Sequence, residues 1–328
     1  MDDFYMQQKY VVFTGSCYAL PIIQLLAQQH KLAGVVVPEG ELNPDLQQLQ
    51  SYLSAQSIHI AQYTANDSSA LIAQLDAWRV TDGVIYLFRH IVHSSLCQFF
   101  NGNLYNIHPG KLPEYRGPMP LYWQLREGLD TFSLTLHRLE ASADSGAIGM
   151  ELEVPFHPFE TLTSAQQKAS QMTAKLMYDF LIAQQKQGLV WREQVSNPNE
   201  VARAVNQHDL HIRWNVQTSR EIVNLVRAGN HDFGGAMLSL PNGVANVLQA
   251  SAMETSLAGV EAGSILEISP QHGLQVKTLD SAISIDVIAT QQGVFSGYRY
   301  AQMAGLDAGM SLLQPASKEI SQYGSLRH

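Results

Sequence analysis

The chain has 328 residues and a mass of 36.3 kDa, which is enough for two domains of about 100–200 residues each. Apolar residues make up 45% and charged residues 15% of it, so collagen-like, low-complexity and wholly disordered proteins are excluded. The formal net charge is −9, and this disfavours binding of a nucleic acid through broad neutralisation of its phosphates.

The cysteines and the N-terminus give no sign of a metal site, a secretory signal or a membrane span. Cys17 and Cys97 are far apart and have no Cys/His ligand spacing, so neither a disulfide framework nor a zinc site is predicted. The start, MDDFYMQQKY, is acidic and polar, and no apolar run approaches the roughly 18 residues of a membrane span. We therefore expect a cytoplasmic protein without metal and without a membrane partner.

The first hundred residues alternate between short apolar runs and segments with helical spacing. The predicted strands are 10–16, 32–37, 58–63 and 83–88, and the predicted helices are 18–29, 44–56 and 68–78. This alternation predicts a mostly parallel sheet covered on both faces, with its ligand site at the carboxyl ends of the strands. The first turn, TGSCYA, has a single glycine, so no dinucleotide fingerprint is predicted.

The remaining chain predicts a second, β-rich domain. A long amphipathic helix over 162–187 ends the first domain, and the polar segment after it contains Pro198, as an exposed connection would. Short strands separated by turn signals follow a helix at 219–229, which is typical of a small barrel or sandwich. We predict a first domain over 1–190, a linker over 191–207, a second domain over 208–314 and a tail over 315–328.

The segment NIHPGKLPEYRGPMP, residues 106–120, carries the candidate chemistry. Asn106 and His108 are two residues apart on a predicted strand, so their side chains point to one face. An asparagine donates a hydrogen bond without titrating, and a histidine exchanges a proton near neutral pH, so the pair could stabilise an oxyanion while moving a proton. Asp144 lies in a predicted turn beside Gly146. A lone histidine or a turn aspartate is often only structural, but their combination favours catalysis.

These elements resemble the signature of the formyltransferases that use 10-formyltetrahydrofolate. That signature comprises Asn-x-His, a Leu-Pro pair, Arg-Gly-x-x-Pro and a later Asp-x-Gly turn. This chain matches it at Asn106, His108, Leu112, Pro113, Arg116, Gly117, Pro120, Asp144 and Gly146. Residues 212–237 are similar to the start of the C-terminal OB-like domain in two-domain members that resemble methionyl-tRNA formyltransferase. The resemblance implies an α/β, Rossmann-like, mostly parallel sheet followed by a small OB-like β-barrel.

The resemblance also implies roles for three residues. Asn106 and His108 would stabilise the oxyanion formed when an amine attacks the formyl carbon of 10-formyltetrahydrofolate. Asp144 would orient His108, raise its pKa and help move the amine proton to the folate nitrogen. No metal is required for this chemistry.

The substrate contacts implied by the resemblance lie in two loops. The pterin is expected near residues 86–92, because family members bind it there largely through backbone groups. The donor-binding candidates are Phe88, Arg89, Ile91 and Gly110, and the acceptor-binding candidates are Lys111 and Arg116. Gly110 stands where the family commonly has a serine, so it removes a hydroxyl. His137, on a strand with alternating apolar residues, is expected to be structural.

The acceptor is expected to be a small molecule with a primary amine, and a nucleotide-linked amino sugar is the most specific expectation. Members that act on tRNA usually carry a basic insertion after the second strand, whereas residues 37–48 hold Glu39, Glu41 and Asp45 and no lysine or arginine. These charges would repel phosphate, so methionyl-tRNA is the less favoured alternative. The oligomeric state is left open.

Two further alternatives are a formyltetrahydrofolate hydrolase and a non-catalytic folate-binding protein. Such hydrolases typically carry a regulatory domain before the catalytic one, whereas the first predicted strand already begins at Tyr10. A binding protein has no need of all three polar residues Asn106, His108 and Asp144, so their presence argues for an enzyme.

Overall fold

The computed structural model describes residues 8–40, 43–65, 67–186, 188–195, 202–241, 243–255 and 257–315. The chain forms two compact units, and each is described by itself. The first unit comprises Met1–Pro120, Thr131–Pro155 and Gln166–Val201, and the second comprises Leu121–Asp130, Phe156–Ala165 and Ala202–His328. Residues 196–201 of the predicted linker and 316–328 of the predicted tail lie outside the described residues, so the linker and tail stay predictions.

A seven-stranded sheet forms the centre of the first unit, in the order β3-β2-β1-β4-β5-β6-β7. Its strands are β1 (Tyr10–Phe13), β2 (Leu32–Pro38), β3 (Ile60–Tyr63), β4 (Asp82–Ile85), β5 (Leu104–His108), β6 (Thr131–Arg138) and β7 (Ile148–Pro155). The first five strands pair in parallel, and β6 and β7 are antiparallel. The prediction of a Rossmann-like, mostly parallel sheet is therefore confirmed.

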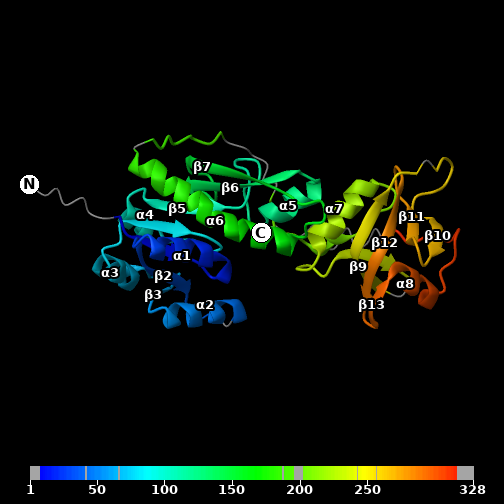
Figure 1. Ribbon diagram of the computed structural model, residues 1–328, viewed down its shortest axis with the longest axis horizontal. Helices are drawn as coiled ribbons and strands as arrows, with labels where there is room; N and C mark the ends of the chain where they lie inside the picture. Colours follow the sequence, from blue (N-terminus) through cyan, green and yellow to red (C-terminus); the bar gives the residue numbers. More distant parts are fainter. Residues whose placement is uncertain are drawn as a thin grey trace, which may run out of the picture. The chain divides into compact units, whose positions relative to one another are not determined.

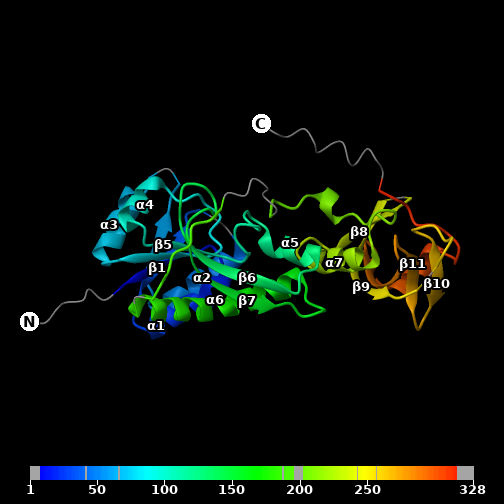
Figure 2. The ribbon, with the colours of Figure 1, turned by 90° about the horizontal axis from the view of Figure 1, so that it is seen from above.

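Helices cover both faces of this sheet. They are η1 (Cys17–Ala19), α1 (Leu20–Gln28), α2 (Pro44–Ala55), α3 (Ser69–Ala77), α4 (Ser94–Phe100) and α6 (Leu162–Gln185). Figure 2 shows α3 and α4 on one side of the strands and α1 and α6 on the other. Apolar side chains of α3 and α4 pack on β1, β2 and β4 in one buried cluster, as the helical spacing predicts.

The second unit is built on an antiparallel sheet in the order β10-β11-β12-β9-β8, with β13 paired to β12. Its elements are α5 (Pro120–Glu127), η2 (Gln207–Leu210), α7 (Ser219–Gly229), β8 (Ala236–Leu240), β9 (Gly243–Met253), β10 (Ile265–Ser269), β11 (Gly273–Lys277), β12 (Ala282–Thr290), β13 (Gly293–Ser296) and α8 (Gly297–Ala304). Helix α7 lies beside β9 (Figure 1). Within the described part of the chain, no pairing joins β10 to β8. The sheet is thus not closed, and the expected OB-like barrel is not confirmed.

Helix α5 packs with the second unit although it directly follows the Asn106–Pro120 segment. The Tyr122 ring contacts Phe233 edge-on at a centroid distance of 5.4 Å, and Arg126 Nη1 donates to the Glu221 carbonyl at 3.1 Å. Buried aromatic pairs of this kind contribute beyond their area burial. The first domain predicted from the sequence therefore contains a helix that packs on C-terminal residues.

Among the helices in the described ranges, none is both long enough and apolar enough to cross a membrane.

Candidate active site

Asn106 and His108 lie on one face of β5, where the strand reaches the carboxyl edge of the parallel sheet. β5 is an interior strand: Asn106 is opposite Ile85 of β4 and His137 of β6. Pairing on both sides fixes the strand, so the direction of its alternating side chains is fixed too. Asn106 is half-buried and His108 is only 4% exposed. The two-residue spacing thus places both groups as predicted.

Asp144 reaches the same place from the turn between β6 and β7. Its backbone is left-handed, with φ +51°, a conformation that aspartate tolerates better than most residues. Gly146 has no room for a side chain, because a Cβ there would collide with the carbonyl oxygen of Arg138. The residue types of the Asp-x-Gly turn are therefore those that its backbone requires.

The Asp144 carboxylate joins four groups from three segments. Its Oδ1 accepts a hydrogen bond from Asn106 Nδ2 at 3.1 Å and lies 3.5 Å from both His108 Nδ1 and His137 Nε2. Its Oδ2 accepts from the backbone N–H of Gly117 at 3.2 Å. The Asp144 side chain is 14% exposed, so these contacts are largely shielded from water. This shielding strengthens them, because the local dielectric constant is low.

The hydrogen-bond partners determine where the protons lie. His108 Nε2 is 2.7 Å from the Tyr115 carbonyl, and a carbonyl can only accept, so Nε2 carries the hydrogen and Nδ1 faces Asp144. By the same reasoning His137 Nδ1 donates to the Arg138 carbonyl at 2.8 Å. His137 Nε2 then accepts from Asn106 Nδ2 at 3.1 Å. Both amide hydrogens of Asn106 are engaged, one with Asp144 and one with His137.

Burial and charge shift the pKa values of two of these groups. Burial lowers the pKa of His108 and outweighs the opposing effects of the Asp144 carboxylate and the Tyr115 carbonyl. Burial alone would raise the pKa of Asp144, but the contact with His137, the positive charge that His108 or His137 can carry and the Gly117 N–H together lower it. The site therefore holds an ionised Asp144 beside a neutral His108 at pH 7. Asp144 raises the pKa of His108 as expected, yet the net shift is downward.

His137 was expected to be structural, but the structure places its ring among the polar groups of the site. It is fully buried and contacts both Asn106 and Asp144. On β6 the apolar residues Phe132, Leu134 and Leu136 alternate with polar residues as predicted, and all three are buried, as His137 is. The signal that would have identified it is the β5–β6 register, which sets His137 opposite Asn106 and which the sequence does not display.

Gly110 packs closely against the His108 ring. It is buried, and its carbonyl accepts a hydrogen bond from Thr135 Oγ1 at 2.8 Å. A Cβ at this position would lie 2.7 Å from Pro120 Cβ and 2.8 Å from His108 Nε2. On this backbone, a serine would displace His108 or Pro120. The departure from the family pattern therefore has a steric reason.

The two expected acceptor contacts differ in their surroundings. Lys111 is exposed and lies 3.7 Å from Glu114 in a surface ion pair, which contributes little to stability. Arg116 instead donates from Nε and Nη2 to Gln194 Oε1 at 3.1 and 2.6 Å. Gln194 in turn donates to the Asp144 turn. No motif in the sequence pointed to Gln194.

The loop expected to face the pterin follows β4, the parallel neighbour of β5. Phe88 packs edge-on against Phe13 and Tyr63, at centroid distances of 5.8 and 5.3 Å, so its ring belongs to the core cluster. Arg89 is exposed and Ile91 is 92% exposed. The Ile91 carbonyl accepts a hydrogen bond from the Tyr63 hydroxyl at 2.6 Å. The loop therefore presents backbone and exposed side chains at the same edge as Asn106.

In the parts of the chain that the structure describes, no cluster of three or more His, Cys, Asp or Glu side chains could hold a metal ion.

Solved structures with the same fold cover between 76% and 94% of the chain. HypX from Aquifex aeolicus, in complex with tetrahydrofolic acid, has a TM-score of 0.57 and 13% identity; the match covers 94% of this chain and 51% of HypX. This chain thus spans about half the length of HypX. An N-formyltransferase from Helicobacter canadensis, in complex with folinic acid and dTDP-3-aminofucose, has a TM-score of 0.63 and 15% identity, with 88% and 100% coverage. A sugar N-formyltransferase from a Shewanella species has a TM-score of 0.57 and 19% identity, with 76% and 100% coverage.

Family comparison agrees with both units. Residues 8–181, more than half of the chain, match the family described as formyl transferase, and this range contains Asn106, His108 and Asp144. Residues 204–295 match the formyl transferase C-terminal domain. The protein belongs to the formyl transferase family and contains both its formyl transferase domain and its C-terminal domain.

Proposed function

We propose that this protein transfers the formyl group of 10-formyltetrahydrofolate to a primary amine of a small molecule, with a nucleotide-linked amino sugar as the acceptor class. The observation that carries the proposal is the convergence of Asn106 and His108 on the Asp144 carboxylate, at 3.1 and 3.5 Å from its Oδ1, at the carboxyl edge of the sheet, in a chain of the formyl transferase family.

The proposed reaction forms one C–N bond and breaks another. The neutral amine attacks the formyl carbon, the carbonyl oxygen takes up the negative charge, and the bond from that carbon to N10 of the folate then breaks. The amine loses a proton and N10 gains one, so no further reactant is needed. Donors aimed at the oxyanion contribute about 2.7–4 kcal/mol each in other acyl transfers.

His108 and Asp144 act together on the amine proton. His108 is neutral, and its Nδ1 has a free lone pair because the hydrogen is on Nε2, held by the Tyr115 carbonyl. A proton taken up at Nδ1 comes to lie between the ring and Asp144 Oδ1, 3.5 Å apart, where the carboxylate stabilises the imidazolium. His108 can then give the proton to N10, directly or through water.

Asn106 is the proposed donor to the oxyanion. Both of its amide hydrogens are engaged in this structure, with Asp144 Oδ1 and His137 Nε2. The oxyanion must therefore replace one of these acceptors. An oxyanion is a stronger acceptor than a neutral imidazole nitrogen, so the bond to His137 is the one we expect to be exchanged.

The folate donor has support from the loop geometry and from related proteins. β4 and β5 are adjacent and parallel, with Ile85 opposite Asn106, so the loop that carries Phe88, Arg89 and Ile91 begins at the edge where Asn106 lies. The structures of HypX with tetrahydrofolic acid and of the Helicobacter enzyme with folinic acid support a folate at this fold. We propose the exposed backbone of residues 89–91 as the pterin contact.

The acceptor class has support from charge and from the same comparisons. The Helicobacter enzyme was solved with dTDP-3-aminofucose, a nucleotide-linked amino sugar. In this chain the segment after β2 carries Glu39, Glu41 and Asp45; Glu41 lies outside the described residues. Negative charge there opposes a long polyanion such as tRNA much more than a compact nucleotide sugar.

A turnover assay tests the proposal. The purified protein is incubated with 10-formyltetrahydrofolate and, in separate reactions, a panel of nucleotide-linked amino sugars, initiator methionyl-tRNA, or no acceptor, while tetrahydrofolate release is followed by absorbance and the product by mass spectrometry. Formylation of an amino sugar supports the proposal. Turnover with tRNA alone contradicts the acceptor class, and formate release without acceptor shows a hydrolase. Folate binding without turnover in any reaction contradicts the catalytic proposal.

A further inference from the structure

The side chain of Gln194 makes four hydrogen bonds that connect two loops of the active site. Its Nε2 donates to the carbonyls of Asp144 at 2.9 Å and Gly146 at 2.7 Å. Its Oε1 accepts from Arg116 Nε at 3.1 Å and Nη2 at 2.6 Å. A carboxamide has two N–H donors and two acceptor lone pairs, so the group is fully used. A rotated amide would set oxygen against two carbonyls, so only this orientation satisfies it.

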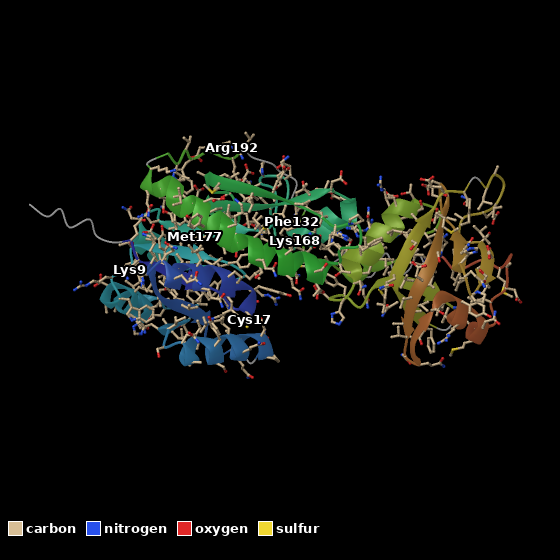
Figure 3. All side chains as sticks on the ribbon, in the orientation of Figure 1. Lys9, Cys17, Phe132, Lys168, Met177 and Arg192 are labelled. Atoms are coloured by element: carbon tan, nitrogen blue, oxygen red, sulfur yellow. The ribbon has the colours of Figure 1, made fainter. Side chains whose placement is uncertain are left out.

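The backbone that carries Gln194 is held against β7 of the first unit. Arg192 and Ile148 exchange two backbone hydrogen bonds, both of 2.8 Å. Arg192 is seen beside the sheet in Figure 3, and its Nη2 donates to Glu151 at 2.7 Å. Trp191 stacks on Tyr105 at a centroid distance of 5.7 Å. Gln194 therefore extends from an ordered segment, as a positioning group must.

The two loops that Gln194 connects are those that hold the Asp144 carboxylate. One is the left-handed turn of Asp144 itself. The other contains Arg116, whose neighbour Gly117 donates its N–H to Asp144 Oδ2 at 3.2 Å. One amide thus restrains both the backbone of Asp144 and the loop that anchors its side chain.

We propose that Gln194 is a positioning residue for formyl transfer, which holds the Asp144 carboxylate between Asn106 and His108. The inference rests on the proposed function for its kinetic consequences. Gln194 lies between the two ranges that match the family, 8–181 and 204–295, so the family match assigns it no role. Arg116 then belongs to the same arrangement, because its Nε and Nη2 are bound to Gln194.

Two substitutions distinguish a residue that positions the Asp144 carboxylate from one that only links the two loops. Gln194→Ala removes all four bonds. Gln194→Glu keeps acceptors for Arg116 and adds an ion pair, but it sets a carboxylate oxygen against the carbonyls of Asp144 and Gly146. If Gln194 served only to bind Arg116, the glutamate variant would have the kcat of the wild type. If Gln194 positions the Asp144 turn, kcat should fall in both variants.

The kinetic experiment compares these variants with Glu193→Gln, an exposed neighbour on the same segment. We expect kcat of Gln194→Ala and Gln194→Glu to fall about 10- to 100-fold, because displacements near 1 Å have costs of that order. The KM values for donor and acceptor should change much less. The control should retain wild-type kcat. Wild-type kcat in both Gln194 variants overturns the proposal.

A second readout does not depend on turnover. Ring-nitrogen NMR on histidine-labelled protein, with the His108 signals identified by their loss in His108→Ala, follows the titration of His108. The titratable groups that face Asp144 are His108 from β5 and His137 from β6. With Asp144 displaced, His108 loses a carboxylate that favours its charged form, so its titration midpoint should fall in both variants. An unchanged midpoint together with a lowered melting temperature would show a purely structural role. If the wild type transfers no formyl group, the proposed function fails while this measurement still decides the inference.

Discussion

His137 Nε2 lies 3.1 Å from Asn106 Nδ2, directly across the antiparallel pairing of β5 and β6. Since His137 Nδ1 donates to the Arg138 carbonyl, Nε2 is left to accept. One hydrogen of the Asn106 amide is thereby held toward β6 and the other toward Asp144. His137 and Asp144 thus set the plane of the Asn106 amide, the proposed donor to the oxyanion.

Replacement of His137 should therefore disturb Asn106. In His137→Phe the Asn106 amide loses the acceptor that orients it before the oxyanion forms, a defect that costs about 1–3 kcal/mol, and we expect kcat to fall about tenfold. His137→Gln, whose Oε1 can accept the same hydrogen, should retain more activity. Steady-state kinetics on the two variants makes the comparison. Equal kcat in His137→Phe and wild type would show that Asn106 does not need this partner.

His108→Ala and Asp144→Asn should abolish most turnover. Loss of a positioned acid–base group costs about 10²- to 10⁴-fold. Asparagine also tolerates the left-handed backbone of residue 144, so the turn should keep its shape. Circular dichroism and donor binding by fluorescence should show folded protein that still binds folate. Full activity in either variant would remove that residue from the mechanism.

Gly110→Ser should damage both stability and catalysis. The new Cβ would meet Pro120 Cβ at 2.7 Å and His108 Nε2 at 2.8 Å, and overpacking of this kind costs about 1–3 kcal/mol. We expect lower stability in urea denaturation and a reduced kcat, because His108 must move. Gly188→Ser is the matched control, since no atom lies within 4 Å of a Cβ built there. Similar stability of the two variants would contradict the steric role of Gly110.

The pH profile should show an acid limb set by His108. Burial holds its pKa below the ordinary value of 6.5, so the ring stays neutral as the pH falls to 6.5 and becomes protonated only at lower pH. A protonated His108 cannot accept the amine proton. We expect the acid-side midpoint of kcat/KM for the acceptor to lie below pH 6.5, measured with an acceptor whose amine pKa is known and corrected for. A corrected midpoint clearly above pH 6.5 would mean that burial does not lower the pKa of His108 in the working enzyme, or that another group accepts the amine proton.

Local patterns predicted the first unit well because they reflect local physics. Alternating apolar runs and helical spacing indicated β1 to β4 with their helices, and the spacing of Asn106 and His108 placed both on one face of β5. The second unit was predicted less well. Short strands with turn signals identify an antiparallel sheet but do not say whether its two edge strands pair, and in the described residues β10 and β8 do not.

The sequence by itself determined the α/β fold of the first unit, the family and the three polar residues of the site, because residue spacing and motif order are local properties of the chain. Only the tertiary structure brought His137 to Asn106 and Gln194 to the Asp144 turn, and it also joined Arg116 to Gln194. Those contacts depend on strand register and on a segment that returns along β7 some 50 residues after Asp144. No short-range pattern predicts the path of this segment. The path depends on which apolar surfaces can be buried, and which backbone and side-chain hydrogen bonds can be made, at the same time.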